Sequence, residues 1–212
     1  MNTDAGSWND DYKQRGRLWG GAVHNLPCIP PDSHVLELGC GNGKTFFVLA
    51  QRGVDVVAVD FSVHAATMSR NVASHAPSGD VAIADARRLP FSDESFDTVI
   101  AFHVIGHMCE KDRARIAGES KRVLRQNGNL HFSGFSIEDF REGTGRIVEP
   151  QTFERMTGIV THYFTEPEVQ ALFVGLKATR LTTQRWTMRV RGKDHPRAEV
   201  VAIFEKKWQD SV

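Results

Sequence analysis

The sequence lacks an excess of charge of either sign: among its 212 residues, 26 basic side chains balance 26 acidic ones. Such a chain has no overall attraction for nucleic acid or for an anionic membrane surface, so we expect neither as a partner. It also lacks an apolar run long enough to span a bilayer, and its polar first ten residues are not those of a signal peptide.

Cysteine is scarce as well. The three cysteines, Cys28, Cys40 and Cys109, are widely spaced and include no Cys-x-x-Cys pair. This pattern argues against a disulfide framework and a structural zinc site, so we expect no metal and a cytoplasmic location. Cys40 lies in a glycine-rich turn, where a small packing residue is more common than a nucleophile.

Short apolar segments alternate with amphipathic ones from residue 34 to residue 135. This alternation predicts a parallel sheet with helices on both faces. We expect strands at 34–38, 54–59, 81–84, 96–104 and 130–135, and helices at 44–52, 62–73 and 111–125, the last ended by Asn127-Gly128.

The last third of the chain has a different pattern. Residues 136–163 are predicted to form loops, and Thr165 with Glu168 is a capping box that starts a helix. Residues 180–190 and 199–206 predict two long antiparallel strands. The expected fold class is therefore α/β: a single Rossmann-like doubly wound sheet, mostly parallel, with a C-terminal antiparallel hairpin.

The most informative stretch is Val35-Leu36-Glu37-Leu38-Gly39-Cys40-Gly41-Asn42-Gly43. A glycine turn between a buried strand and a helix lets the backbone pass close to a nucleotide-like ligand. Glu37 precedes the turn, and Asp60 ends the second strand, where a carboxylate can accept hydrogen bonds from both ribose hydroxyls. A dinucleotide-binding turn would have glycine at Lys44, so a ligand with a cationic amino-acid tail fits better than a pyrophosphate.

Residues 33–135 resemble the class I (Rossmann-like) S-adenosylmethionine-dependent methyltransferases, of the small methyltransferase-domain type. Glu37 to Gly43 matches the glycine-rich first motif, and Asp60 matches the acid that closes strand two. Asp85 matches the acid after strand three, and Phe96-Asp97-Thr98-Val99-Ile100 matches the fourth strand. The resemblance implies S-adenosylmethionine as cofactor and S-adenosylhomocysteine as product.

The resemblance also implies roles for single residues. Asp60 would hold the ribose, Phe61 would pack on the adenine, and Asp85 would receive the adenine amino group. Each of three residues also has a competing structural interpretation. Asp85 could cap a turn before Arg87, Phe61 could be a core residue, and Glu37 could hydrogen-bond the turn without touching the ligand. The expected cofactor site comprises Glu37, Gly39, Cys40, Gly41, Gly43, Asp60, Phe61, Asp85, Ala86 and His103.

His103 and His107 follow the fourth strand, on the rim where this fold presents residues to the transferring methyl group. Either could take a proton from an incoming hydroxyl or amine. The competing interpretation is that His103 only lines the pocket and His107 only bonds a loop. Alignment of nucleophile, methyl and sulfur supplies much of the acceleration, so no covalent intermediate is required.

The flanking segments are expected to contact the methyl acceptor. Within one domain over 1–212, we expect a helical lid (1–30), a cofactor-binding core (31–135), an acceptor-side insert and helix (136–176) and the hairpin (177–212). The insert contributes arginines that could recognise an acidic acceptor, although a solvated loop face is the commoner role. The expected acceptor-side residues are Trp8, Tyr12, Trp19, His107, His162 and Tyr163, each with ordinary packing as the competing interpretation.

The leading functional prediction is transfer of a methyl group to a small-molecule acceptor. An RNA or protein methyltransferase is the first alternative, against which stand the charge balance and the sequence His103-Val104-Ile105-Gly106, where many amino-group methylating nucleic-acid enzymes have Asn-Pro-Pro-Tyr. A non-catalytic module that binds S-adenosylmethionine is the second. The acceptor atom and the oligomeric state do not follow from the sequence.

Overall fold

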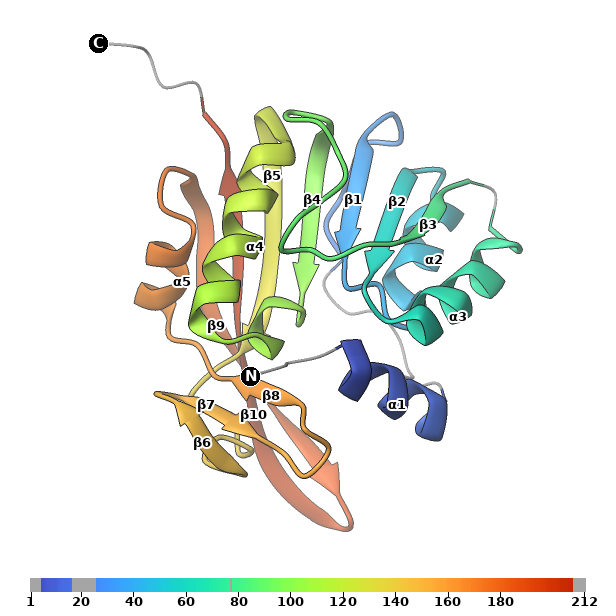
Figure 1. The fold of residues 1–212 in the computed structure, drawn as a ribbon. Helices are drawn as coiled ribbons and strands as arrows, with labels where there is room; N and C mark the ends of the chain where they lie inside the picture. Colours follow the sequence, from blue (N-terminus) through green and yellow to red (C-terminus); the bar gives the residue numbers. More distant parts are fainter. Residues whose placement is uncertain (1–4, 17–25, 77, 208–212) are drawn as a thin grey trace.

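The computed structural model describes residues 5–16, 26–76 and 78–207. Its centre is a seven-stranded sheet in the order β3-β2-β1-β4-β5-β10-β9 (Figure 1). The first five of these strands are parallel, whereas β10 and β9 are antiparallel, which confirms the predicted Rossmann-like sheet with its hairpin. The strands are β1 (His34–Leu38), β2 (Asp55–Asp60), β3 (Asp80–Ile83), β4 (Phe96–Phe102), β5 (Leu124–Phe135), β9 (Lys177–Val190) and β10 (Lys193–Glu205).

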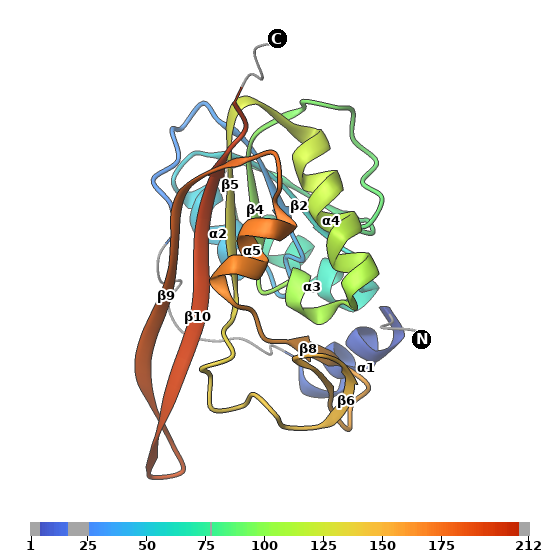
Figure 2. The same cartoon turned by 90° about the vertical axis from the view of Figure 1, so that its left-hand side faces the viewer.

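Helices pack on both faces of this sheet (Figure 2). The described helices are α1 (Ala5–Arg15), α2 (Lys44–Gln51), α3 (Val63–Ala73), the 3-10 turn η1 (Ile105–His107), α4 (Glu110–Val123) and α5 (Glu166–Leu172), and α1 lies beyond the end of the sheet, not on a face. The apolar side of α2, with Phe46 and Leu49, packs in one core cluster, and those of α4 and α5, with Ile116 and Val169, pack in the other. Among the described helices, none is long and apolar enough to cross a membrane.

Both predicted N-cap residues start their helices, but the capping box at Thr165 lacks its second bond: Glu168 Oε1 lies on His162, and Oε2 has no partner among the described residues. The Ser62 hydroxyl accepts a hydrogen bond from the backbone N–H of Ala65 at 3.2 Å, so α3 begins where predicted. The Thr165 hydroxyl accepts one from the N–H of Glu168 at 3.3 Å, at the start of α5. These side chains satisfy amide groups that the first helical turn leaves without a partner.

The stop signal expected at Asn127-Gly128 has a different role. The helix α4 ends at Val123, and β5 begins at the next residue. Asn127 lies inside β5 with φ of 60°, next to a shift in the register between β4 and β5. An asparagine in the left-handed region therefore marks a β-bulge here, not a helix end.

Further elements gather past the carboxyl ends of the parallel strands: α1, the tip of the hairpin and a small antiparallel sheet (Figure 1). The prediction of loops over 136–163 was wrong, because this small sheet lies within that segment. Its strands are β6 (Arg146–Glu149), β7 (Thr152–Glu154) and β8 (Val160–His162). Strands of three or four residues are too short to display an alternating pattern that sequence can reveal.

Candidate functional site

A cavity of about 710 Å³ opens at this carboxyl edge, between the strand ends, the hairpin and α1. Open α/β sheets bind ligands at this position, beyond the carboxyl ends of their parallel strands. The predicted site residues in its wall are Trp8, Tyr12, Glu37, Gly39, Cys40, Gly41, Asp60, Phe61, Asp85, Ala86, His103 and His107.

The glycine turn borders the cavity at Gly41. Its φ is 55°, and a Cβ added there would lie 2.5 Å from the Tyr12 hydroxyl of α1. Gly43, with φ of 76°, lies outside the cavity wall as the N-cap of α2, where an added Cβ would lie 3.0 Å from Ser69. The structure therefore places Gly43 in helix packing and not beside the predicted ligand.

Two carboxylates lie side by side next to this turn, and both are buried. Asp60 accepts hydrogen bonds from the backbone N–H groups of Gly41 at 2.9 Å and Ser62 at 2.8 Å. Glu37 is 5% exposed, and its Oε2 has no hydrogen-bond partner among the described residues. Burial, and then the nearby Asp60, raise the pKa of Glu37 to about 8. A buried acid pair with an orphaned oxygen is suited to a cationic ligand.

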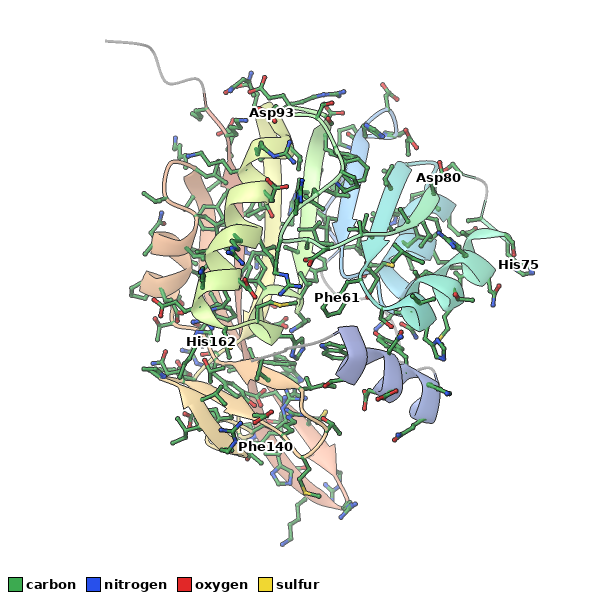
Figure 3. All side chains as sticks on the ribbon, viewed as in Figure 1. Phe61, His75, Asp80, Asp93, Phe140 and His162 are labelled. Atoms are coloured by element: carbon green, nitrogen blue, oxygen red, sulfur yellow. The ribbon has the colours of Figure 1, made fainter. Side chains whose placement is uncertain are left out.

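Asp85 takes part in a local structure as well as in the cavity wall. Its carboxylate accepts bonds from the backbone N–H of Arg87 at 2.9 Å and from the guanidinium of the same residue. Partial burial opposes ionisation of Asp85, but these bonds outweigh it and lower the pKa. The structure thus shows Asp85 as the cap of a turn, and its place in the cavity wall leaves the predicted contact with adenine as a prediction. Phe61 lies at the end of β2 beside α1 (Figure 3).

The helix α1 covers the cavity. Its Asn9 side chain accepts hydrogen bonds from the Ser62 hydroxyl at 2.8 Å and the backbone N–H of His64 at 3.1 Å, which dock α1 at the start of α3. Tyr12 is 6% exposed, and the ring of Trp8 lies edge-on to His107 at 4.9 Å. One helix therefore contacts both the glycine turn and the rim of β4. Trp19, also predicted for this site, lies outside the described residues.

His103 occupies a special position at the end of β4. Its φ is 55°, a region that costs energy for any residue other than glycine. Its Nε2 lies 3.0 Å from Glu199 Oε2, and its ring lies 4.5 Å from that of Phe135. Because a carboxylate only accepts, Nε2 carries the proton. The other nitrogen, Nδ1, is buried with no hydrogen-bond partner among the described residues.

His107 is held differently. Its Nδ1 lies 2.8 Å from the carbonyl oxygen of Val160 and donates to it, which ties η1 to the small sheet. Burial lowers the pKa of His107 to about 4, so the ring is neutral at physiological pH. This geometry favours the structural interpretation of His107, with a strand of the small sheet as its partner in place of the expected loop. Its ring also lines the cavity.

His162 and Tyr163 do not reach the cavity wall, and this corrects their predicted place on the acceptor side. His162 is 2% exposed and lies at 2.7 Å from both Thr152 Oγ1 and Glu168 Oε1 (Figure 3). Tyr163 is also buried, and its hydroxyl donates to the carbonyl of Arg141 at 3.0 Å. Both side chains hold the small sheet against the domain.

The sequence did not point to the wall opposite the glycine turn. It consists of Ser133 and Phe135 of β5, Gln184, Arg185 and Trp186 of β9, and Arg197, Glu199 and Val201 of β10. We call these eight residues the hairpin wall. Side chains alternate along a strand, so residues 197, 199 and 201 share a face; that this face borders a cavity depends on pairing between distant strands. Within the described ranges, no three His, Cys, Asp or Glu side chains gather as a metal site requires.

A family model described as "Methyltransferase domain" matches residues 36–132, the stretch that holds the glycine turn, the acid pair, Asp85 and His103. The matched segment is a class I S-adenosylmethionine-dependent methyltransferase domain. The matched segment begins within β1 and ends within β5, so it contains the five parallel strands.

Proteins similar to this methyltransferase domain differ in what they are named for. A probable S-adenosylmethionine-dependent methyltransferase of Mycobacterium tuberculosis is 36% identical over 55% of this chain and 40% of its own. A 2-methyl-6-phytyl-1,4-hydroquinone methyltransferase of Synechocystis is 28% identical over 84% of this chain and 56% of its own. A tRNA N(3)-methylcytidine methyltransferase of Drosophila melanogaster is 27% identical over 81% and 58%. The chain thus spans about half the length of these relatives.

Among solved structures, a SAM-dependent methyltransferase from Methanosarcina mazei matches the domain with a TM-score of 0.73 and 23% identity, over 85% of this chain and 95% of the other. At 23% identity, this structural match establishes that the two chains share a fold. What the domain acts on has to be argued from its own cavity.

Proposed function

We propose that this domain transfers the methyl group of S-adenosylmethionine to a small-molecule acceptor inside the cavity. The observation that carries the proposal is the contrast between the two ends of the cavity. One end holds the glycine turn and the buried acid pair, and the other holds the hairpin wall with His103 at its border. Formation of S-adenosylhomocysteine across a panel of metabolites, measured separately from cofactor binding, tests both transfer and acceptor size.

The cofactor end fits S-adenosylmethionine on two features of the chain. The orphaned Oε2 of buried Glu37 would face the positive charge of the methionyl part, and Gly41 leaves room that a side chain would fill. Asp60 would accept from the ribose hydroxyls while its oxygens keep the backbone bonds to Gly41 and Ser62. We assign Phe61 and Ala86 to packing against the adenine, with Asp85 as acceptor for its amino group.

At the acceptor end, we assign His103 as the general base and Glu199 as the residue that holds it. S-adenosylmethionine supplies a methyl group on a sulfonium, which a nucleophile displaces in line. His103 would take the proton of the incoming nucleophile on Nδ1, which is buried in this structure and has to be uncovered as the acceptor binds, while Glu199 holds Nε2–H and stabilises the imidazolium that forms. Trp8 and Tyr12 of α1 would exclude water from the aligned reactants.

The raised pKa of Glu37 predicts a pH-dependent affinity for S-adenosylmethionine. Below about pH 8 the unliganded acid is protonated, and a cation binds its ionised form, so binding must release a proton. Affinity should therefore rise with pH from about 4.5 to about 8, by up to about tenfold per pH unit. The same raised pKa makes the unliganded protein less stable as pH rises through that window.

Calorimetry in buffers with different heats of ionisation measures this proton release. Glu37→Gln keeps the shape of the side chain and removes its titration, so its affinity should not change with pH across this window. A wild-type affinity that is constant over the same range would contradict the assignment of Glu37.

Asp60→Ala should weaken binding of S-adenosylhomocysteine at least about tenfold, because a charge-assisted hydrogen bond contributes about 1.5 to 3 kcal/mol. It should also lower the stability of the free protein, since the buried amide of Gly41 loses its acceptor. Asp55→Ala, at the start of the same strand, is the matched control. Unchanged affinity in a folded Asp60→Ala protein would rule out the ribose assignment.

An RNA acceptor is the second candidate, and a concentration of charge supports it. Seven of the 21 residues from Lys177 to Arg197 are basic and one is acidic, although the whole chain is neutral. These residues form β9 and the tip of the hairpin, and the similar proteins include a tRNA methyltransferase. Binding of tRNA that weakens steeply with salt would favour this candidate over the small acceptor.

A further inference from the structure

The hairpin wall has the composition of a binding surface. Strand pairing places Glu199 of β10 between Phe135 of β5 and Gln184 of β9, and Arg197 opposite Trp186. Trp186 is 41% exposed, although it lines a cavity. An indole ring left open in this way offers an apolar face to a flat ligand. The ring of Phe135 lines the same cavity next to His103.

Arg197 is held rigidly in this wall. Its Nε donates to the buried carboxylate of Asp139 at 2.5 Å, and its guanidinium carbon lies 5.3 Å from the centre of the Trp186 ring and 5.4 Å from that of Phe135. Within the described part of the chain, its Nη groups make one hydrogen bond, to the Met188 thioether at 3.4 Å, which is a weak acceptor. The Nη donors of this guanidinium therefore have no strong acceptor among the described residues.

Arg197 shares its carboxylate partner with a second arginine. The single carboxylate of Asp139 also accepts from the Nε of Arg141, at 2.8 Å, and so serves two guanidinium groups. Burial, and then repulsion from Arg197, act to lower the pKa of Arg141 despite its bond to Asp139.

The other charged side chains of the wall have partners of their own. Glu199 lies on the Nε2 of His103, and Arg185 is matched by Glu138 in a two-point pair. A buried guanidinium that shares one carboxylate with a second guanidinium gains from an anionic ligand.

We propose that the acceptor is a planar aromatic compound that carries an oxyanion, with its ring against Trp186 and Phe135 and its anionic group on Arg197. The inference rests on the proposed function and names the substrate class. His103, which packs on Phe135, then lies beside the ring edge, where a hydroxyl or amine substituent would be methylated.

A matched pair of probes tests this class. Salicylate and salicylamide have the same ring and hydroxyl group, and only salicylate carries a carboxylate. With the domain saturated with S-adenosylhomocysteine, NMR titration should give about tenfold tighter binding of salicylate, equivalent to about 1.4 kcal/mol. Arg197→Met should remove most of this preference. Arg189→Met, which loses an exposed arginine paired with Asp194 outside the cavity, should retain it.

Trp186→Ala provides a second variant that does not disturb the Asp139 cluster. It should weaken both probes to a similar extent and leave the preference for salicylate unchanged, and added salt should weaken salicylate alone. Equal binding of the two probes, failure of both to bind, or a preference that survives Arg197→Met would overturn the proposal. S-adenosylhomocysteine affinity measured on the same samples separates the outcomes: its absence contradicts the proposed function, whereas its presence without a salicylate preference contradicts only this inference.

Discussion

Replacement of Gly41 by valine is expected to abolish binding of S-adenosylmethionine and S-adenosylhomocysteine, with an affinity loss greater than about a hundredfold. The added Cβ would lie 2.5 Å from the Tyr12 hydroxyl, and its methyl groups would extend into the space through which the turn meets the ligand. Either α1 moves away from the cavity or the turn changes shape, and both outcomes remove the cofactor end. Calorimetry with each ligand measures the loss.

Gly53→Val is the matched control for this variant. Gly53 has φ of 76°, close to that of Gly41, but an added Cβ would meet nothing within 4 Å. Both valines therefore incur a similar backbone penalty, of about 1 to 2 kcal/mol, and only one blocks the site. Gly41→Val with wild-type affinity would show that the ligand binds elsewhere.

His103→Asn is expected to lower turnover by about 10²- to 10⁴-fold, the usual contribution of a general base. Asparagine is chosen because it tolerates the positive φ of this position better than most residues, so the backbone after β4 is retained. Affinity for S-adenosylhomocysteine should change little. Turnover is measured with any acceptor that the metabolite panel identifies.

The contact between Glu199 and His103 gives a second test of this prediction, through the pH dependence of turnover. Glu199→Gln keeps an oxygen that can accept from Nε2 but removes the charge that stabilises the imidazolium, so the acid limb of the pH–rate profile, where the base becomes protonated, should move to lower pH. His34→Asn removes a histidine that lies near Asp55, outside the cavity wall, and should leave turnover unchanged. Normal turnover in His103→Asn would assign that residue to packing alone.

The cofactor end could be predicted because its signals are local. The buried strand β2 has four apolar residues in a row, Val56 to Val59, and the turn after β1 needs glycine within a few positions of the strand end. Ser62 and Thr165 announce helix starts through bonds that span three residues. Each of these features depends on neighbours along the chain, so the printed sequence contains it.

The acceptor end could not be predicted in the same way, because it depends on long-range pairing. Glu199 faces His103 only because β10 pairs with β5, which is more than sixty residues earlier in the sequence. His162 precedes a recognisable cap and has an aromatic neighbour, which suggested a ligand contact. Pairing of β7 with β8 instead places His162 against Thr152, inside the packed interior.

The hairpin wall begins at Ser133, directly after the family match ends at residue 132. The two ends of the cavity are thus encoded by separate stretches of the chain, one within the shared motif region and one after it. Mutations in β9 and β10 can alter the surface opposite the cofactor while the glycine turn and Asp60 stay intact. If the wall holds the acceptor as proposed, this separation explains how proteins with a recognisable cofactor half come to be named for a hydroquinone in one case and a tRNA in another.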